Sequence, residues 1–152
     1  MESQDNFRLQ QVGAFTTKEF ADDDYKDYIK WYSHLKRARG DYPERQMLSD
    51  DGLIITYNGV KVVAGFLYVT NSNIAMIEFV IANPKAKRDI RKKALNILLT
   101  HLESIAIHKC YDIMLILTNN TFYGNTLTEG FNYLRGDTPH FEYVKRLWQQ
   151  EH

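Results

Sequence analysis

Three consecutive segments of the sequence predict a strand, a helix and a second strand, and this order restricts the fold more than any other feature. Ile74–Ala82 is apolar and rich in β-branched residues, and Tyr111–Leu117 is almost wholly apolar, as expected of a strand covered on both faces. Between them, apolar residues recur at helical spacing from Ala94 to Ala106, and polar residues from Lys92 to Lys109 fall on the opposite face, which predicts a helix of about five turns. This order of elements predicts a parallel βαβ crossover.

An antiparallel hairpin is predicted before the crossover. Leu53–Tyr57 and Val60–Thr70 are separated by Asn58-Gly59, and the tolerance of this dipeptide for positive φ makes it the strongest short-range hairpin signal. Pro84 closely follows Ile74–Ala82 and should end that strand. The middle of the chain therefore predicts three strands before the helix.

The N-terminal part predicts a short strand and a helix. Phe7–Val12 has the pattern of a strand, and Thr16–Glu19 has the spacing of a capping box, so we expect a helix to begin near residue 17. Gly40 and Pro43 should end it. An apolar stripe at three- and four-residue steps predicts its buried face, which consists of Tyr25, Tyr28, Ile29, Tyr32 and Leu35. These tyrosines fit core packing better than a stacking surface.

The C-terminal part predicts two small elements. Asn119–Glu129 should form a short helix or turn that closes at Gly130-Phe131, and His140–Leu147 should form a last strand. The chain of 152 residues is long enough for one core and too short to argue for two. Residues 1–152 are therefore expected to form a single domain.

Charge and cysteine content argue against several classes of function. Nineteen Lys and Arg residues balance nineteen Asp and Glu residues, so no overall positive field attracts nucleic acid or an anionic membrane. The single Cys110 excludes an internal disulfide and is expected to be buried beside Tyr111. No apolar run approaches the ~18 residues of a membrane span, and no signal peptide is recognisable. These features predict a soluble cytoplasmic protein.

A basic segment joins the strand Ile74–Ala82 to the helix that follows it. The segment after Asn83-Pro84 contains no glycine. Its cations are Lys85, Lys87, Arg88, Arg91, Lys92 and Lys93. Its position suits a phosphate-binding turn, because the N-terminus of a helix binds anions. Its composition also suits the solvated start of a surface helix, and the residues alone leave both interpretations open.

The order of elements and two spacings resemble the GNAT family of N-acetyltransferases. In that family a Pro ends a central strand and is followed by Arg/Gln-x-x-Gly-x-Gly/Ala and an Ala-Leu pair. The matching positions here are Pro84, Lys87, Ile90, Lys92 and Ala94-Leu95. The family also has an Asn eleven residues before a Gly-Phe pair, as Asn119 and Gly130-Phe131 are here. The resemblance implies an α/β (α+β) fold with a mixed sheet, antiparallel in its N-terminal strands.

The resemblance implies acetyl-coenzyme A as the cofactor. Backbone groups at the end of a strand would pair with the pantetheine arm, and these belong to Val80, Ile81 and Ala82. The 85–92 loop would bind the phosphates, with contacts from Lys87, Arg88, Ile90, Arg91 and Lys92. Asn119 would orient the cofactor.

The phosphate motif departs from the family pattern at its glycines. Ile90 and Lys92 stand where the family has Gly and Gly/Ala, and a side chain there makes close approach of a pyrophosphate harder. Asp89 would itself cap the N–H groups at the helix start and repel a phosphate. The motif is therefore degenerate, although its cations favour phosphate binding.

The resemblance also implies which groups are catalytic. Glu78 is the candidate general base for the acceptor amine. Thr126 stands where the family has a Tyr that protonates the leaving thiolate, so Tyr123, one turn earlier, becomes the candidate acid. Transfer would be direct, because no Cys or Ser lies beside a base in the pattern. His101 and His108 lack further ligands at metal-binding spacing, which argues against a metal site.

Two functions stay open at this point. The first is transfer of an acetyl group from acetyl-coenzyme A to an amine of unknown identity. The second is a non-catalytic structural or interaction protein, because Lys85-Ala86-Lys87-Arg88 is similar to a run in small GNAT-like proteins of tailed bacteriophages. The resemblance would then place the protein in the host cytoplasm or the virion. A protein partner would contact the aromatic N-terminal helix or the C-terminal segment that contains Tyr143 and Trp148.

Overall fold

The computed structural model describes residues 9–33, 42–118 and 120–136, together with Tyr143, Lys145 and Leu147. The chain forms two compact units, Met1–Leu117 and Thr118–His152. The first unit contains a six-stranded sheet whose strands are adjacent in chain order. The strands are β1 (Leu9–Val12), β2 (Phe15–Glu19), β3 (Asp51–Tyr57), β4 (Val60–Val69), β5 (Ile74–Ala82) and β6 (Ile113–Leu115).

Four of the five strand pairings are antiparallel, and only β5 and β6 run parallel. The turn between β3 and β4 places Asn58 at φ 49° and Gly59 at φ 81°, as the two central positions of a hairpin turn require. The hairpin and the strand Ile74–Ala82 predicted from sequence are confirmed. The parallel crossover is confirmed as well, because α2 (Arg88–His108) connects β5 to β6.

The prediction of a helix beginning near residue 17 is wrong. Phe15–Glu19 forms β2, which pairs with β1 through a turn at Gly13 (φ 61°) and with β3 on its other side. Thr16 and Thr17 are β-branched and suit a strand, and strand pairing on both sides outweighs the capping-box spacing. The helix starts later, after a 3₁₀ turn at Asp22–Asp24, as α1 (Tyr25–Tyr32).

α1 carries the aromatic stripe that the sequence predicted. Tyr28 is fully buried and Trp31 is nearly so, which confirms the core-packing interpretation. They pack with Phe20, Phe66 and further residues in one cluster: Leu48, Ile54, Ala64 and Ile81. The helix ends at Tyr32, earlier than predicted, while Leu35 and Gly40 lie outside the described residues.

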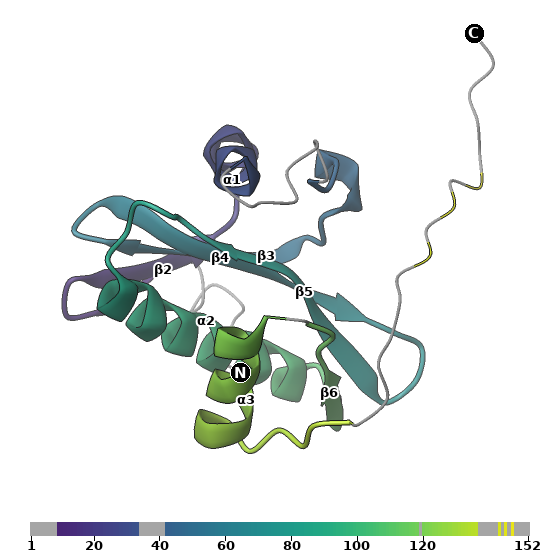
Figure 1. Cartoon of the computed structure of the whole chain (residues 1–152). Coiled ribbons are helices and arrows are strands. Elements are labelled where there is room, and N and C mark those ends of the chain that lie inside the picture. Colours follow the sequence, from purple (N-terminus) through teal and green to yellow (C-terminus); the bar gives the residue numbers. More distant parts are fainter. Residues whose placement is uncertain are drawn as a thin grey trace, which may run out of the picture. The chain divides into compact units, whose positions relative to one another are not determined.

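α1 and α2 cover opposite faces of the sheet (Figure 1). α2 spans 21 residues, so it begins before the basic segment ends and is longer than predicted. Its contact with the sheet is close at Gly65, where an added Cβ would lie 2.9 Å from Val80 Cγ2 and 3.0 Å from Leu98 Cδ2. Glycine at this position lets the helix approach β4. No helix among the described residues is long and apolar enough to cross a membrane.

Two expectations about the region after α2 are wrong. β6 spans only Ile113–Leu115, and its terminal residues are 51% and 42% exposed, so the strand is not covered on both faces. It pairs with β5 over three residues only. Cys110 is exposed rather than buried, because it occupies the left-handed position (φ 65°) just after the end of α2.

The second unit contains one described helix, α3 (Thr121–Gly130). The side chain of Asn120 caps it by accepting a hydrogen bond from the Tyr123 N–H at 3.0 Å. This confirms the short helix predicted between Asn119 and Gly130. Of the strand predicted over His140–Leu147, the structure describes only Tyr143, Lys145 and Leu147, and none of these is in a strand.

Candidate functional site

β5 has two strand neighbours over only part of its length. It pairs with β4 as far as Ala82, but with β6 only from Ile74 to Met76. From Ile77 to Ala82 the second edge of β5 has no strand partner among the described residues. Such an edge presents backbone N–H and C=O groups that can pair with an extended ligand.

The direction of the peptide groups on this edge follows from one hydrogen bond. The N–H of Asn83 donates to the Val62 carbonyl at 2.7 Å, on the β4 side. Successive N–H groups of a strand point to alternate sides. The N–H group of Ala82 therefore points to the open edge, within the segment for which the sequence predicted contact with the cofactor.

A β-bulge interrupts β5 beside this open edge. Ile81 lies opposite Ala64 and Glu78 lies opposite Phe66, so two residues of β5, Phe79 and Val80, face a single residue of β4. Phe79 adopts φ 57°, a left-handed conformation that costs roughly 1–2 kcal/mol for a residue with a side chain. The surroundings must hold this conformation in place.

Glu78 lies on the face of the sheet that α1 covers. Its register partner Phe66 belongs to the α1 cluster, and partners across antiparallel strands share a face. Glu78 is half-buried and close enough to Tyr68 that its charge, after the larger effect of burial, helps raise the pKa of the Tyr68 hydroxyl. The predicted general base therefore lies next to the bulge, one residue before Phe79.

A pair of tyrosine hydroxyls on α1 reaches the bulge. Tyr28 Oη donates a hydrogen bond to the Phe79 carbonyl at 2.8 Å, and Tyr28 Oη and Tyr32 Oη are 2.9 Å apart. Burial raises the pKa of Tyr28 far above its ordinary value and that of Tyr32 to about 12. Both hydroxyls therefore keep their protons at neutral pH.

The turn after β5 leads directly into the N-terminus of α2. Asn83 organises it, since its Oδ1 accepts from the Lys85 N–H at 3.0 Å and its side-chain amide donates to the Lys61 carbonyl at 3.0 Å. α2 starts at Arg88, and the N-cap residue Lys87 provides no side-chain cap. The N–H groups in the first turn of a helix have no acceptor within the helix, so the start of α2 is a place where an anion can bind.

Asp89 does not cap the helix as the sequence suggested. No hydrogen bond to its carboxylate is found among the described residues. The predicted 85–92 phosphate loop is also shorter, because residues 88–92 belong to α2. Ile90 is half-buried and Lys92 is exposed within the helix, where side chains project outward from the axis. Glycine at these two positions is thus less necessary than in an open loop.

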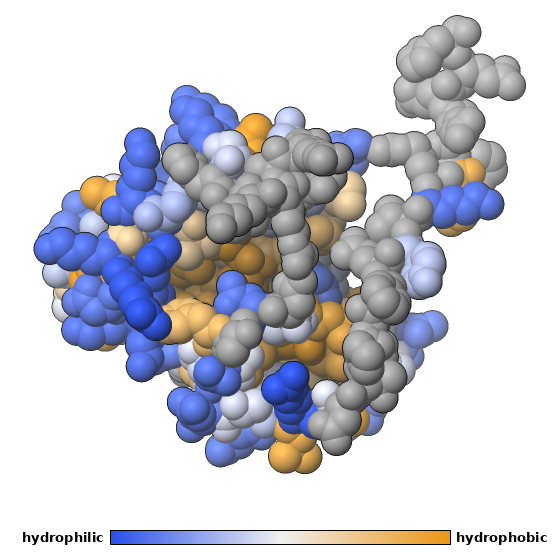
Figure 2. Space-filling model, in the orientation of Figure 1, coloured by the Kyte–Doolittle hydropathy of each residue, from blue (hydrophilic) through white to orange (hydrophobic). Residues whose placement is uncertain are grey.

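The basic side chains of this segment gather at one end of the first unit. Lys87, Arg88 and Lys92 are exposed and Arg91 is half-buried. The left side of Figure 2, over the β3–β4 turn and the start of α2, is mostly hydrophilic. These cations could attract a phosphorylated ligand to the helix N-terminus.

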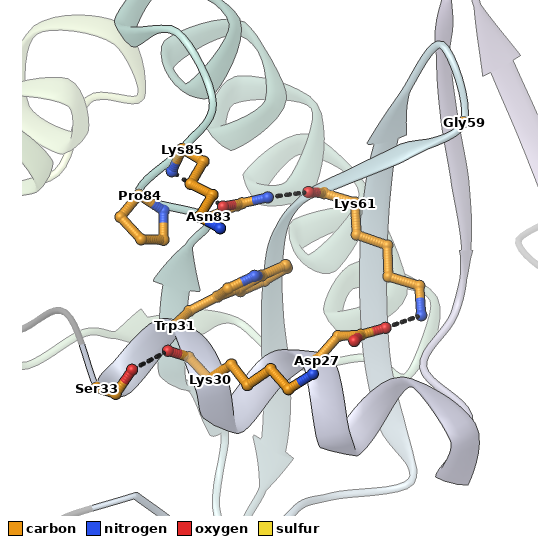
Figure 3. Close-up of a pocket in the computed structure, with 9 residues that line it drawn as sticks. All are labelled: Asp27, Lys30, Trp31, Ser33, Gly59, Lys61, Asn83, Pro84 and Lys85. Atoms are coloured by element: carbon orange, nitrogen blue, oxygen red, sulfur yellow. Dashed lines mark hydrogen bonds and ion pairs between the residues drawn. The ribbon is translucent and has the colours of Figure 1, made fainter.

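A pocket of about 550 Å³ opens beside the same turn, on the α1 side (Figure 3). Its lining residues come from α1 and the residue after it, the β3–β4 turn, the start of β4 and the turn after β5: Asp27, Lys30, Trp31, Ser33, Gly59, Lys61, Asn83, Pro84 and Lys85. Lys61 is fixed there by Asp24 at 2.8 Å and Asp27 at 2.9 Å. The ion pairs of Lys61 therefore form one side of the pocket, and Lys30 and Lys85 also line it.

The remaining predicted site residues belong to the second unit. Tyr123 and Thr126 are on α3, and Thr126 Oγ1 donates to the Phe122 carbonyl at 3.1 Å. Asn119 lies outside the described residues. Sequence reasoning missed the bulge at Phe79 and the role of the tyrosine hydroxyls. The only sequence signal was the tyrosine stripe, which was correctly assigned to the core. The described residues contain no cluster of side chains able to hold a metal ion.

Comparison with known proteins identifies the fold. No protein-family model matches the sequence, and no curated protein sequence matches it either. Similar solved structures include the ribosomal-protein-S18-alanine N-acetyltransferase of Escherichia coli, at 14% identity and a TM-score of 0.56, covering 76% of this chain and 74% of that one. AAC(6')-Iy, solved with the bisubstrate analogue CoA-S-monomethyl-acetylneamine, is 14% identical with a TM-score of 0.60, over 87% of this chain and 98% of that one.

A third similar structure is the N-acetylglutamate synthase of Neisseria gonorrhoeae in complex with coenzyme A and N-acetyl-glutamate. It is 16% identical with a TM-score of 0.59, and 78% of this chain matches 28% of that longer one. The mixed sheet with its parallel crossover and flanking helices is thus the fold of N-acetyltransferases of the GNAT type. The expected fold class is confirmed.

Proposed function

We propose that this protein is an N-acetyltransferase that moves an acetyl group from acetyl-coenzyme A to an amine. One observation carries the proposal: the open edge of β5 from Ile77 to Ala82 leads, through a short turn, to the N-terminus of α2. An extended arm that ends in phosphates matches this arrangement, because it can pair with the strand edge and place its phosphates at the helix.

The described residues fit coenzyme A as a ligand. The N–H groups of Val80 and Ala82 would bind the pantetheine arm, as would the backbone of Ile81 between them. The first N–H groups of α2 would bind the pyrophosphate, with Lys87, Arg88, Ile90, Arg91 and Lys92 around it. Asn119 is the further proposed contact. Bound acetyl-coenzyme A would supply an activated acetyl thioester.

The residues near the bulge would carry out the transfer. Glu78 would accept the proton of the acceptor amine as the N–C bond forms and the C–S bond breaks. Tyr123 is the proposed donor of a proton to the leaving thiolate, with Thr126 at the matching family position.

The acceptor is proposed only as an amine. AAC(6')-Iy was solved with an acetylneamine bisubstrate analogue, and another similar structure is named as an alanine N-acetyltransferase. Their acceptors differ in size and charge, so the shared fold supports the amine class and no particular compound.

Isothermal titration calorimetry with acetyl-coenzyme A at modest ionic strength tests the proposal. The expected result is one site with micromolar affinity for the native protein. Lys87→Gln should weaken binding several-fold, because its cation lies at the N-terminus of α2. Lys93→Gln is the matched control, since Lys93 is an exposed lysine more than one turn further along the helix. Absence of binding up to millimolar cofactor would contradict the proposal.

A further inference from the structure

The pocket on the α1 side contains lysines whose charge is not used in an ion pair. Of the three lysines that line it, Lys61 is held by Asp24 at 2.8 Å and by Asp27 at 2.9 Å. Lys30 and Lys85 are exposed, and neither forms an ion pair with any residue that the structure describes. These two ammonium groups are therefore available to a ligand.

The charges around the pocket leave an excess of positive charge. Asp24 also binds Lys18, at 2.6 Å, so the two carboxylates are balanced by the two lysines that hold them, Lys18 and Lys61. Lys30 and Lys85 then add two positive charges to a neutral cluster. A cation in the pocket would be repelled by these lysines, whereas an anion would be attracted to them.

The indole of Trp31 adds a donor without an acceptor. Trp31 lines the pocket and is only 6% exposed, and Figure 3 shows its ring between the turn after β5 and the side chains of Lys30 and Asp27. The indole N–H can only donate, and in a buried tryptophan it usually has a partner. Here it makes no hydrogen bond to the described part of the chain. An acceptor oxygen bound in the pocket would satisfy it.

The other polar side chains of the pocket are occupied by bonds within the protein. Asn83 binds the Lys85 N–H and the Lys61 carbonyl. Ser33 donates from its N–H and its hydroxyl to the Lys30 carbonyl, at 3.2 and 2.6 Å, so this carbonyl at the end of α1 already has partners. Among the described lining residues, the side-chain groups left without a partner are two ammonium groups and one indole N–H. All three are donors, which a ligand can use only with acceptor atoms.

We infer that this pocket is a second binding site, which takes the phosphate group of a small phosphorylated molecule, with Lys30, Lys85 and the Trp31 indole as its donors. A phosphate monoester has a charge of about −1.5 to −2 at neutral pH and three acceptor oxygens, which match two cations and one N–H. The volume of about 550 Å³ leaves room for the rest of a small molecule. The inference is independent of the proposed function, because none of these three side chains is a proposed cofactor or catalytic contact.

Phenyl phosphate is the probe for this site, since it joins a phosphate monoester to a small apolar ring. In a nuclear magnetic resonance titration of the native protein, the indole N–H signal of Trp31 should move downfield and saturate, because the N–H gains an oxyanion as acceptor. The chain has one other tryptophan, Trp148, whose indole signal serves as the reference. Absence of a saturable Trp31 shift at tens of millimolar phenyl phosphate would overturn the inference.

A pair of lysine substitutions on α1 tests whether the pocket itself binds the probe. Lys30→Gln removes one cation of the pocket and should weaken binding of phenyl phosphate by roughly two- to fivefold, the loss expected for one exposed cation. Lys26→Gln is the matched control, because Lys26 is exposed on the same helix and does not line the pocket. Its affinity should stay near that of the native protein. Equal weakening in both variants would mean that surface charge attracts the probe without a site, and the inference would be wrong.

Competition with coenzyme A separates this site from the proposed cofactor site. Saturating coenzyme A should leave the Trp31 shift by phenyl phosphate in place, and Lys87→Gln should not change the affinity for phenyl phosphate. If coenzyme A displaced the probe and dephospho-coenzyme A did not, the pocket would bind the 3′-phosphate of the cofactor, and the inference of a second site would be overturned. Binding of phenyl phosphate at Trp31 without any binding of acetyl-coenzyme A would support the second site and contradict only the proposed function.

Discussion

The two faces of the six-stranded sheet differ in chemistry, although each is covered by a helix. The residues that α2 buries are aliphatic: Ala94, Leu95, Leu98, Leu99, Leu102 and Ala106. The cluster beneath α1 is aromatic and includes Phe20, Tyr28, Trp31 and Phe66. The α1 side also has hydroxyl hydrogen bonds and the ion pairs of Asp24. An aliphatic face can only pack, whereas the α1 face can also orient polar groups.

We expect the α2 side of the sheet to contribute mainly to stability and the α1 side to contribute to ligand binding and transfer as well. The bulge at Phe79 and the carboxylate of Glu78 are on the α1 side, while the close contact at Gly65 is on the α2 side. α2 contributes to the proposed site only through its first turn. Substitutions under α2 should therefore affect folding, and selected substitutions on the α1 side should affect binding or transfer at nearly constant stability.

The largest expected effect is on the transfer rate. With an amine identified by screening, Glu78→Gln should slow acetyl transfer by about 10²–10⁴-fold, because a neutral amide cannot accept the proton of the amine. Its affinity for acetyl-coenzyme A should stay near that of the native protein. Glu129→Gln, at an exposed position of α3, serves as the control. A Glu78→Gln rate within threefold of native would remove Glu78 from the mechanism.

Leu98→Ala should give the largest loss of stability. Leu98 is fully buried under α2, and truncation of such a side chain leaves a cavity that costs about 3 kcal/mol. Urea denaturation measures the free energy of unfolding, and acetyl-coenzyme A affinity should be unchanged for the folded protein. Leu134→Ala, at a residue that is 97% exposed, should change neither. Equal losses in both variants would show that the α2 face is not the stabilising core.

Asp24→Asn tests the ionic part of the α1 side. Burial by itself would raise the pKa of Asp24, but hydrogen bonds from Lys18 and Lys61, at 2.6 and 2.8 Å, outweigh it and hold the pKa below its ordinary value. The substitution should cost about 2 kcal/mol at neutral pH, below the usual range for a buried pair because both lysines are partly exposed.

The pH dependence of stability gives the sign of this contribution. A carboxyl whose pKa is lower in the folded state stabilises the protein above its unfolded pKa of ~3.9, and this contribution is lost as pH falls through the folded pKa. Denaturation curves at a series of pH values should therefore show the native protein and Asp24→Asn converging below about pH 4. A constant difference down to the acid limit would mean that the Asp24 charge is not the cause.

The smallest expected effect tests whether position 92 lies in a helix or in an open phosphate-binding loop. Lys92→Gly should lower stability by about 1 kcal/mol, because position 92 is inside α2. It should not improve affinity for acetyl-coenzyme A, although restoring a glycine of the family motif would do so if residues 85–92 formed an open loop. Tighter binding by Lys92→Gly would favour the loop interpretation.

The central part of the fold was predictable because its signals are local and agree with one another. The dipeptide Asn58-Gly59 determines the hairpin, and the alternation of strand and helix patterns around α2 determines the parallel crossover. The β2 strand was missed because Thr16–Glu19 satisfies a helix-start pattern, while its pairing with β1 and β3 depends on distant residues.

The site was only partly predictable for the same reason. The motif spacing pointed to the end of β5 and the start of α2, and the structure describes there an open strand edge followed by a helix whose N-cap residue provides no side-chain cap. The left-handed Phe79 has no sequence signal, because a phenylalanine in an apolar run suggests regular strand. Its hydrogen bond with Tyr28 joins residues 51 positions apart, a relation that no local pattern contains.

Nuclear magnetic resonance titration with acetyl-coenzyme A tests the central claim most directly, because it reports which amides meet the ligand. The account predicts saturable shifts for the amides of Ile77–Ala82 and Lys85–Ile90, with little change at the β1–β2 turn around Gly13. No shift at millimolar ligand, or shifts confined to the pocket at Lys30 and Trp31, would contradict the claim that the open edge of β5 and the start of α2 form the cofactor site.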